Sequence, residues 1–362
     1  MKKLVFLVKN IYNQAGDTRA VLLVANQLMK TGLYKIDILS LFKTNEIPLF
    51  SIDNKITVHN LFDSPFNLKK NYFKVLRAFD GFIKKNEIDI VFIEAIGFNC
   101  FTFPILKKYK EIKTIAVEHA SYFDGGKILG MAWFGRIIAC KFTDCVVVLT
   151  KKDKLDYCNN MGKIKRIEQI YNPLDPELKK MEYSETSKKI ISCGRLVEVK
   201  GYDLLLEVAS KVFKKHPTWQ WHIYGDGPER KRLENRIAEL NLEENVTLKG
   251  EVNNIYDLYN DYSIYGLTSR SESFGLVLLE ALKVGIPVVS FNCNNGPSEI
   301  IKDKENGYLI PFNDLDAMSQ KICYLIENAS LRKEFSNNTE KYLNEFNIRN
   351  VTDQWENIIN TI

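Results

Sequence analysis

Short apolar segments alternate with amphipathic segments along most of this chain. The apolar segments have the length of β-strands and lie at Leu4–Val8, Ile36–Leu41, Ile90–Glu94, Thr114–Glu118, Cys145–Leu149, Ile190–Cys193, Gln220–Tyr224, Val246–Lys249, Ile264–Thr268 and Pro287–Phe291. Between them are stretches with helical periodicity, such as Arg19–Lys30 and Tyr202–Lys214. Strand–helix alternation builds parallel sheets with helices on both faces. The sequence therefore predicts an α/β fold made of doubly wound parallel sheets.

The pattern begins again near residue 190, which indicates two similar domains in tandem. With 362 residues, the chain is too long for one ordinary domain and suits two. Pro173 and Pro176 disfavour the continuation of a helix or a strand ladder between the two halves. We predict an N-terminal Rossmann-like domain over 1–172 and a C-terminal one over 173–346. We expect 347–362 to form a helix that packs back on the N-terminal domain.

The cysteines indicate a reducing compartment. There are seven, an odd number, with no Cys-x-x-Cys pair, and most stand in apolar runs typical of buried thiols. The run Leu4–Val8 is too short for the core of a signal peptide, and no segment approaches the ~20 apolar residues of a spanning helix. The sequence predicts a cytoplasmic protein that can still lie on a membrane surface.

Positive charge is concentrated in the first half. Residues 1–180 contain 29 Lys and Arg against 18 Asp and Glu, a balance of +11, and the remainder contains 21 against 27, a balance of −6. The segment 66–85 has the pattern of a basic amphipathic helix. Its apolar side would carry Phe66, Tyr72, Phe73, Leu76, Phe79 and Ile83, and its basic side Lys69, Lys70, Lys74, Arg77, Lys84 and Lys85. Such a helix either docks on an anionic membrane or packs its apolar stripe on the sheet and leaves its lysines solvated.

Cations and glycines follow the predicted strand Ile190–Cys193. Gly194 and Gly201 enclose a strand-to-helix turn that contains Arg195 and Lys200. Ligands of parallel sheets bind at the carboxyl ends of the strands. A guanidinium binds phosphate oxygens through its planar fork and a lysine adds a point charge, so this turn suits a diphosphate. The alternative is a solvated loop with surface cations.

Two glutamates follow the predicted strand Ile264–Thr268. Glu272 and Glu280 are eight positions apart, and Ser273-Phe274-Gly275 would open a helix whose first N–H groups can receive phosphate. We expect both carboxylates on roughly one face of that helix. Glu280 stands in an otherwise apolar stretch, where a carboxylate needs a partner. A ribose diol is a suitable partner, and a protein group is the alternative.

Three further positions are candidates because of where they stand. His119 follows the predicted strand Thr114–Glu118, at the end where ligands bind. Gly16 lies between the first strand and a helix, although no Gly-x-Gly-x-x-Gly or Walker pattern accompanies it. Asp314 and Asp316 have the Asp-x-Asp spacing of a divalent-metal site. They precede a helix, so capping explains them better, and we expect no metal.

Together these segments resemble glycosyltransferase family 4, whose GT-B fold consists of two Rossmann-like doubly wound domains facing a central cleft. The resemblance covers essentially the whole chain and rests on the order and spacing of short motifs. They are Gly194-Arg195-Leu196…Lys200-Gly201, Tyr224-Gly225-Asp226-Gly227-Pro228, Gly250-Glu251-Val252, Glu272-Ser273-Phe274-Gly275…Glu280-Ala281, Gly285-Ile286-Pro287-Val288-Val289, Gly296-Pro297-Ser298-Glu299-Ile300-Ile301 and Asn306-Gly307-Tyr308-Leu309-Ile310. The pair Glu272…Glu280 matches the family's Glu-x₇-Glu motif.

The resemblance implies a retaining, metal-independent transfer of a hexose or N-acetylhexosamine from a nucleotide diphosphate sugar, with no other cofactor. Arg195 and Lys200 would neutralise the donor diphosphate. Glu272 would contact the donor sugar, and His119 would lie beside it. The remaining donor-binding positions would be Gly16 for the approach of the first loop, Val252 near the base, Phe274, Gly275 and Leu276 through their N–H groups, and Glu280 on the ribose. The family's first loop usually has two glycines, whereas Ala15 precedes Gly16 here.

The resemblance leaves the substrates open. The loop Asn292–Ser298 looks like its counterpart in enzymes of bacterial surface-polysaccharide and teichoic-acid assembly, most of which use UDP-sugars, and this favours a UDP-sugar donor. We expect a saccharide acceptor on a lipid carrier at the inner membrane face, and no nucleic acid partner. One rival is another GT-B enzyme, such as a sugar-nucleotide epimerase or a glycogen-type phosphorylase. A second rival is a non-catalytic module that binds sugar nucleotides or membranes. A binding remnant has no need of Arg195, Lys200, Glu272 and Glu280 together, which argues against the second.

Overall fold

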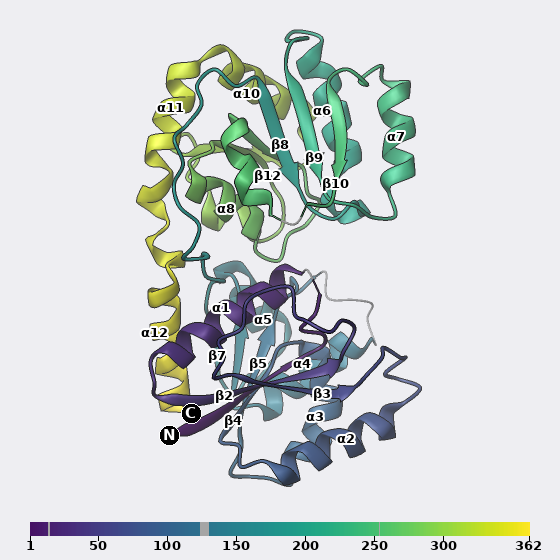
Figure 1. Cartoon of the computed structure of the whole chain (residues 1–362), viewed down its shortest axis with the longest axis vertical. Coiled ribbons are helices and arrows are strands. Elements are labelled where there is room, and N and C mark those ends of the chain that lie inside the picture. The colour runs from purple at the N-terminus through teal and green to yellow at the C-terminus, as the bar shows by residue number, and fades with distance from the viewer. Residues whose placement is uncertain (14, 124–129, 253) are drawn as a thin grey trace. The chain divides into compact units, whose positions relative to one another are not determined.

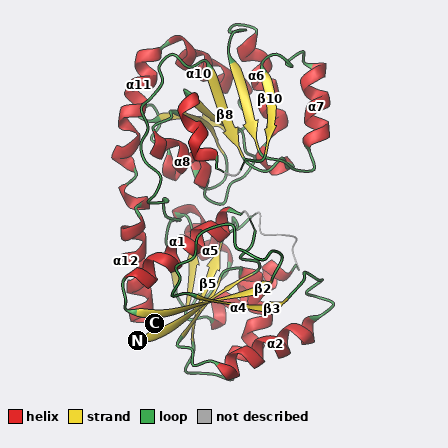
Figure 2. Cartoon of the chain, viewed as in Figure 1, coloured by secondary structure: helices red, strands yellow, loops and turns green. Residues whose placement is uncertain are grey.

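Two parallel sheets, each in a unit of its own, organise the chain (Figures 1 and 2). The computed structural model describes residues 1–13, 15–123, 130–252 and 254–362. Unit 1 consists of Met1–Pro173 with Phe346–Ile362, and unit 2 of Leu174–Glu345. Our predicted domains were 1–172 and 173–346 with a returning helix over 347–362.

Unit 1 contains a seven-stranded sheet in the order β3-β2-β1-β4-β5-β6-β7. Its strands are β1 (Lys2–Val8), β2 (Tyr34–Phe42), β3 (Thr57–Phe62), β4 (Ile90–Ile93), β5 (Lys113–Glu118), β6 (Cys145–Val148) and β7 (Ile167–Gln169). Every neighbouring pair is parallel, and Leu4 of β1 lies between Ile36 of β2 and Ile90 of β4. The strand order reverses between β1 and β4, which is where parallel sheets open a ligand crevice.

Helices cover both faces of this sheet. They are α1 (Gly16–Lys30), α2 (Tyr72–Lys85), α3 (Asn99–Leu106), α4 (Met131–Phe142), α5 (Lys151–Asn160), α12 (Ile348–Thr361) and the short 3-10 helix η1 (Ile96–Phe98). The apolar sides of α1 and α12 share one core with one face of the strands. Those of α2 and α3 share a second core, and α4 and α5 a third, with the opposite face.

The C-terminal helix α12 is part of unit 1. Val351 and Trp355 are buried, and the Trp355 ring lies 5.6 Å from that of Phe92 on β4. Lys2 Nζ donates to the carbonyl of Ile359 at 2.7 Å, so both ends of the chain meet in this unit (Figure 1). A helix with one apolar stripe folds by burying that stripe, and here the stripe completes the core beside α1.

Unit 2 contains a six-stranded parallel sheet in the order β10-β9-β8-β11-β12-β13. Its strands are β8 (Lys189–Cys193), β9 (Gln220–Tyr224), β10 (Val246–Gly250), β11 (Ile264–Leu267), β12 (Val288–Asn292) and β13 (Gly307–Pro311). Its helices are α6 (Tyr202–Phe213), α7 (Arg230–Glu239), α8 (Leu276–Val284), α9 (Pro297–Ile300), α10 (Leu315–Glu327) and α11 (Ala329–Asn338). Short 3-10 helices are η2 (Glu198–Lys200), η3 (Ile255–Asp261), η4 (Thr339–Tyr342) and η5 (Asn344–Phe346), the last of which ends with the first residue of the second segment of unit 1. The strand order reverses between β8 and β11.

Each strand predicted from the apolar runs is present, with ends that differ by a residue or two. Three strands were missed, namely β3, β7 and β13, and all three lie at a sheet edge. The sequences of β3 and β7 carry weaker apolar patterns because these edge strands are less buried, whereas β13 is largely buried. Every residue of β3 and β7 is at least partly exposed.

The basic helix of unit 1 differs from its prediction. It begins at Tyr72 rather than at residue 66, because the Asn67 side chain accepts from Lys70 N at 3.1 Å and forms a turn before the helix. Phe73, predicted on the apolar side, is 73% exposed, whereas Phe82 is buried. The apolar stripe of α2 packs on the sheet through Val75 and Phe79.

Within the described parts of the chain, no helix is long and apolar enough to cross a membrane. The seven cysteines, all of which are described, form no disulfide.

Candidate active site

The turn after β8 packs tightly against the turn after β11. Gly194 N donates to the carbonyl of Tyr224 at 2.9 Å, and Tyr202 Oη donates to the carbonyl of Gly194 at 3.0 Å. Gly201 has a φ of 63°, and a Cβ there would lie 2.1 Å from the Thr268 carbonyl oxygen. Only glycine permits both the left-handed conformation and this approach. The two turns are therefore held in contact at the point where the strand order reverses.

Lys200 and Glu272 form an ion pair at this contact. Lys200 Nζ lies 2.7 Å from Glu272 Oε1 and 2.8 Å from Oε2, and Ser269 Oγ donates to Oε1 at 2.6 Å. The Glu272 side chain is 7% exposed and that of Lys200 is 24% exposed. The sequence predicted each residue as part of the site but not that they pair.

Glu272 is not on the helix that carries Glu280, so the expectation of one shared helical face was wrong. The helix α8 begins only at Leu276, and Gly275 before it has a φ of 96°. This left-handed residue separates the Glu272 turn from the helix. Glu272 instead belongs to the loop after β11, which places it beside Lys200.

Arg195 and Arg270 occupy the same pair of turns in different ways. Arg195 is exposed, and no described residue accepts a hydrogen bond from its guanidinium. The Arg270 guanidinium donates two hydrogen bonds of 2.7 Å to the Asp203 carboxylate at the start of α6 and one of 2.9 Å to the Glu198 carbonyl. Sequence reasoning missed Arg270, although a cation beside Ser269 in a candidate loop was a signal. It fixes the β8 turn, whereas Arg195 is available to an anion.

The N-terminus of α8 lies in the same region. Phe274 is buried, and Gly275 is the N-cap residue before Leu276. A Cβ on Gly296 would lie 2.0 Å from the Phe274 carbonyl oxygen, so the loop after β12 also approaches closely. The first N–H groups of an α-helix have no partner within the helix and favour anions.

Glu280 is half-buried on α8 and has a protein partner. Tyr256 Oη donates to Glu280 Oε1 at 2.9 Å, and the Tyr256 ring stacks on Tyr259 of η3 with centroids 6.1 Å apart. Val252 lies half-buried in the segment between β10 and η3. Tyr256 was not among the predicted residues, and its sequence context contains no signal for it.

In unit 1, His119 pairs with a carboxylate that the sequence did not single out. His119 Nε2 lies 2.7 Å from Glu94 Oε2, and both side chains are almost fully buried. Among the described residues, nothing hydrogen-bonds the buried His119 Nδ1. Both residues line a narrow cavity of about 20 Å³, room for about one water molecule. The available signal for Glu94 was a charged residue ending a buried strand.

The charge on His119 is favoured by its surroundings. Burial alone would lower the pKa of His119, but the hydrogen bond to Glu94 and the charges of Glu94, Asp17 and Glu118 outweigh it and raise that pKa above 6.5.

Gly16, also predicted, is exposed and is the first residue of α1. Gln14 of its loop lies outside the described residues, as does Asn253 after Val252.

Asp314 and Asp316 act as helix-capping and surface residues. Asp314 Oδ1 accepts from Ala317 N at 2.9 Å at the start of α10, which confirms the capping interpretation. Asp316 pairs with Lys211 at 2.5 Å. Over the described ranges, no three His, Cys, Asp or Glu side chains gather as metal ligands.

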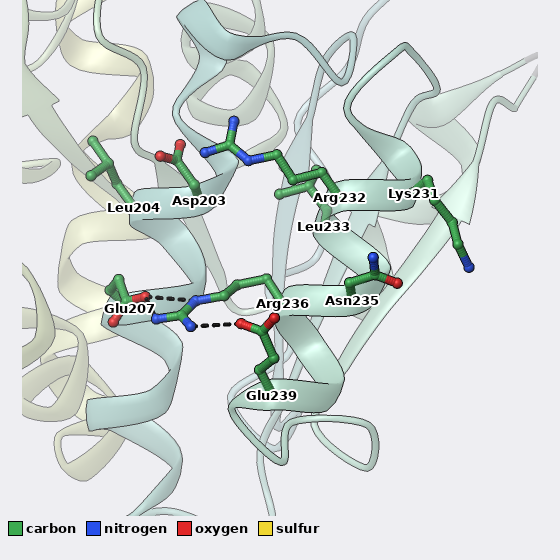
Figure 3. Close-up of a pocket in the computed structure, with 9 residues that line it drawn as sticks. All are labelled: Asp203, Leu204, Glu207, Lys231, Arg232, Leu233, Asn235, Arg236 and Glu239. Carbon is green, nitrogen blue, oxygen red and sulfur yellow. Dashed lines mark hydrogen bonds and ion pairs between the residues drawn. The ribbon is translucent and has the colours of Figure 1, made fainter.

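A larger cavity of about 620 Å³ lies between α6 and α7, and Asp203, the partner of Arg270, is among the residues that line it (Figure 3). Its lining is highly charged, but each charged lining residue has a partner of opposite sign, in the lining or next to it. Arg236 bonds to Glu207 at 2.6 Å and to Glu239 at 2.8 Å. Because these groups neutralise each other on the outer side of two helices, we do not assign the cavity to the site.

Comparison with known proteins identifies the family of the chain. The chain matches the model of Glycosyltransferase Family 4 over residues 16–178 and that of Glycosyl transferases group 1 over 175–342. It is 31% identical to an uncharacterized glycosyltransferase of Haemophilus influenzae over 99% of this chain and 100% of that protein. It is 26% identical, over 99% of this chain and 98% of the other, to the Campylobacter jejuni GalNAc-alpha-(1->4)-GalNAc-alpha-(1->3)-diNAcBac-PP-undecaprenol alpha-1,4-N-acetyl-D-galactosaminyltransferase.

The fold has close counterparts among solved structures. A mutant of S. aureus TarM, in complex with fondaparinux, alpha-GlcNAc-glycerol and UDP, superposes with a TM-score of 0.87 at 20% identity, over 100% of both chains. At this identity the likeness concerns the fold, which is that of the GT-B glycosyltransferases. The two family models, the full-length relative and this fold lead to one conclusion: the chain belongs to glycosyltransferase family 4 and has the GT-B fold.

Proposed function

We propose that this glycosyltransferase is a retaining, metal-independent enzyme that moves a hexose or N-acetylhexosamine from a UDP-sugar to a saccharide acceptor of bacterial surface glycan assembly. The observation that carries the proposal is the contact between the β8 and β11 turns. There Lys200 is held by Glu272, and the exposed Arg195 lies on the same turn as Lys200. Two cations beside a helix N-terminus form a diphosphate site.

The donor would bind to unit 2 through this contact. A lysine has three N–H donors, and Glu272 engages two of those of Lys200, which leaves a third for a phosphate oxygen. Arg195 can bind two phosphate oxygens at once. Phe274, Gly275 and Leu276 would add backbone N–H groups, and Glu280 would accept from the ribose hydroxyls beside Tyr256. Val252 would border the base.

The chemistry follows from stabilising the leaving group. The bond between the anomeric carbon and the phosphate oxygen breaks, and its electron pair stays on the diphosphate, where Arg195 and Lys200 stabilise the new charge. The acceptor oxygen then bonds to the same face of the anomeric carbon and passes its proton to the departing phosphate. Two fixed cations supply the field that a divalent metal supplies in other enzymes, so the reaction needs neither a metal nor another cofactor.

His119 of unit 1 would contact the donor sugar, as the family resemblance implies. Its Nε2 is engaged by Glu94, so Nδ1 is the ring nitrogen left for a substrate oxygen. An imidazole whose pKa is raised can donate a hydrogen bond from that nitrogen. Gly16, which lacks a side chain at the start of α1, would allow the donor to approach the backbone there.

A lipid-linked acceptor at an anionic membrane is the acceptor class we favour. The C. jejuni relative is named for an undecaprenol-linked acceptor. The lysines and Arg77 on α2 and before it are exposed, as is Phe73, while the apolar stripe of the helix is buried. These exposed cations, the basic flank of α2, can therefore contact anionic lipid without unfolding the unit. The protein would work at the inner face of the cytoplasmic membrane, where reduced cysteines persist.

A panel of nucleotides and nucleotide sugars tests the donor. We expect UDP-hexoses or UDP-N-acetylhexosamines to raise the melting temperature and to be hydrolysed slowly, with release of the α-anomer from an α-linked donor by NMR. The matched variant Arg195→Met should lose the thermal shift. Stabilisation by no nucleotide sugar, or release of the β-anomer, would contradict the proposal.

A further inference from the structure

A buried charge cluster in unit 1 surrounds the segment that carries His119. Arg136 Nε on α4 donates to Glu118 Oε2 at 2.7 Å, and Tyr157 Oη on α5 donates to the same oxygen at 2.7 Å. The side chains of Arg136 and Glu118 are 5% and 3% exposed, and Tyr157 is fully buried. Neither the reaction nor the donor site described above uses any of these three residues.

The cluster holds the backbone just beyond His119. The Arg136 guanidinium also donates to the carbonyls of Tyr122 at 2.6 Å and Ser121 at 3.1 Å. Glu118 Oε1 accepts from Ala120 N at 3.2 Å. A single planar guanidinium therefore ties the end of β5 to two successive carbonyls of the following loop, which the flexible ammonium of a lysine cannot reproduce.

Glu118 and His119 anchor the strand end on opposite faces of the sheet. Successive side chains of a strand point to opposite sides. Accordingly Val117 lies in the core beside α1 and α12, and Ala116 in the core beside α4 and α5. His119 is two positions after Val117 and pairs with Glu94. Glu118 is two positions after Ala116 and pairs with Arg136.

The same helix also braces the segment that carries Glu94. Gly135, next to Arg136 on α4, lies so close to η1 that a Cβ there would be 2.3 Å from the Ile96 carbonyl oxygen. Ile96 follows Glu94 by two residues. One turn of α4 thus contacts both segments whose side chains form the His119–Glu94 pair.

A buried ion pair contributes little net stability, because desolvation of the two charges offsets their attraction. Fixing a geometry is a better-attested use of such groups. We propose that Glu118, Arg136 and Tyr157 are positioning residues that hold His119 for transfer. The inference rests on the proposed role of His119 and adds the residues that position it.

The test uses Arg136→Lys and Tyr157→Phe in the full chain. We expect Arg136→Lys to lower kcat at least tenfold while the KM for the donor changes less than twofold, since the donor residues of unit 2 are untouched. Tyr157→Phe keeps the ion pair and should lower kcat less. In ¹³C-histidine spectra the His119 ring signal, assigned with His119→Gln among the four histidines, should shift or split in Arg136→Lys.

Arg332→Lys is the matched control. Arg332 is also a buried guanidinium bonded to carbonyls, those of Leu325, Ile326 and Glu185, and none of them belongs to the candidate site. It should lose a similar amount of thermal stability while kcat and the His119 signal stay as in the wild type. An unchanged His119 signal in Arg136→Lys, or an equal loss of kcat in both variants, would overturn the inference. If His119→Gln is fully active, the proposed role of His119 fails instead, and the spectrum of Arg136→Lys still shows whether the cluster positions the ring.

Discussion

Lys200 Nζ lies within 2.8 Å of both carboxylate oxygens of Glu272, although the two residues are 72 positions apart in the chain. Each comes from the turn after a different strand, and the two strands are neighbours in the sheet. The cation is therefore held in place before any donor binds. Preorganised charge of this kind stabilises a leaving group without rearrangement during the reaction.

Replacing this cation should remove most of the activity. We expect Lys200→Met to lower kcat/KM on the order of 10²–10³-fold, because a lost charge contact to the leaving group removes about 2–4 kcal/mol of transition-state stabilisation. Initial rates with the donor found in the panel measure it. Lys211→Met is the control, since Lys211 pairs with exposed Asp316 only. Turnover near that of the wild type in Lys200→Met would refute the assignment of the diphosphate site.

Replacing Glu280 should impair transfer more than replacing Tyr256, which hydrogen-bonds to it. Glu280→Ala is expected to abolish most transfer by removing the acceptor for the ribose hydroxyls. Tyr256→Phe removes one hydrogen bond to that carboxylate, worth about 1 kcal/mol, so donor KM should rise about fivefold with the fold intact. Initial rates measure transfer and donor KM, and titration of UDP by calorimetry measures the affinity for the nucleotide. Equal affinity in all three proteins would place the ribose elsewhere.

Activity should survive chelation. Arg195, Lys200 and the start of α8 supply the positive field at the proposed diphosphate site, so excess EDTA should change the transfer rate less than twofold. The comparison is between EDTA-treated enzyme and the same enzyme with added magnesium or manganese. Complete loss of transfer that either metal restores would contradict the proposal of metal independence.

Anionic membranes should bind unit 1 in a salt-sensitive way. The protein should sediment with phosphatidylglycerol vesicles at low salt, release at high salt and ignore neutral vesicles, because each cation near an anionic leaflet contributes about 1 kcal/mol. Binding should weaken when four exposed cations become glutamate: Lys69, Lys70, Lys74 and Arg77.

The control for vesicle binding changes four exposed lysines of unit 2 in the same way: Lys211, Lys214, Lys215 and Lys231. Binding should then persist. If the wild-type protein never sediments with anionic vesicles, the acceptor is soluble and the basic flank has another use.

Folding stability should fall in mild acid because of His222. Burial, with the nearby Lys249 and Lys189 charges, lowers the pKa of His222 to about 4. The unfolded chain takes up a proton near pH 6.5, which the folded chain resists, so this contribution is full above pH 6.5 and is lost as the pH falls toward 4. A shift of this size corresponds to about 3 kcal/mol.

Urea unfolding at pH 7 and pH 4.5 measures this loss. His222→Phe should lose less stability between the two pH values, and Tyr262 keeps its 2.8 Å hydrogen bond to Tyr224 in that variant. An identical loss in both proteins would assign the acid sensitivity to other groups.

Local sequence patterns predicted most of the strands and helices, but they could not predict which distant residues pair in the fold. Strands such as Ile90–Ile93 were predictable because apolar residues cluster locally, whereas every residue of β3 is at least partly exposed and its apolar pattern is weak. Lys200 and Glu272 were each predicted from their turns, but only the order of the strands brings them together. The same limit concealed Glu94, Tyr256 and Arg136, since a single polar residue next to a strand or within a helix has no periodic signature.

The return of α12 to unit 1 bears on how the protein is made. Unit 2 is one continuous stretch, Leu174–Glu345, and can complete its core as soon as that stretch has left the ribosome. Unit 1 is translated first, yet Val351, Trp355 and Ile359 of its core come after the whole of unit 2 in the chain. We therefore expect the second unit to complete its core before the first, and the nascent first unit to expose an apolar surface beside α1 that chaperones can bind until α12 has emerged from the ribosome.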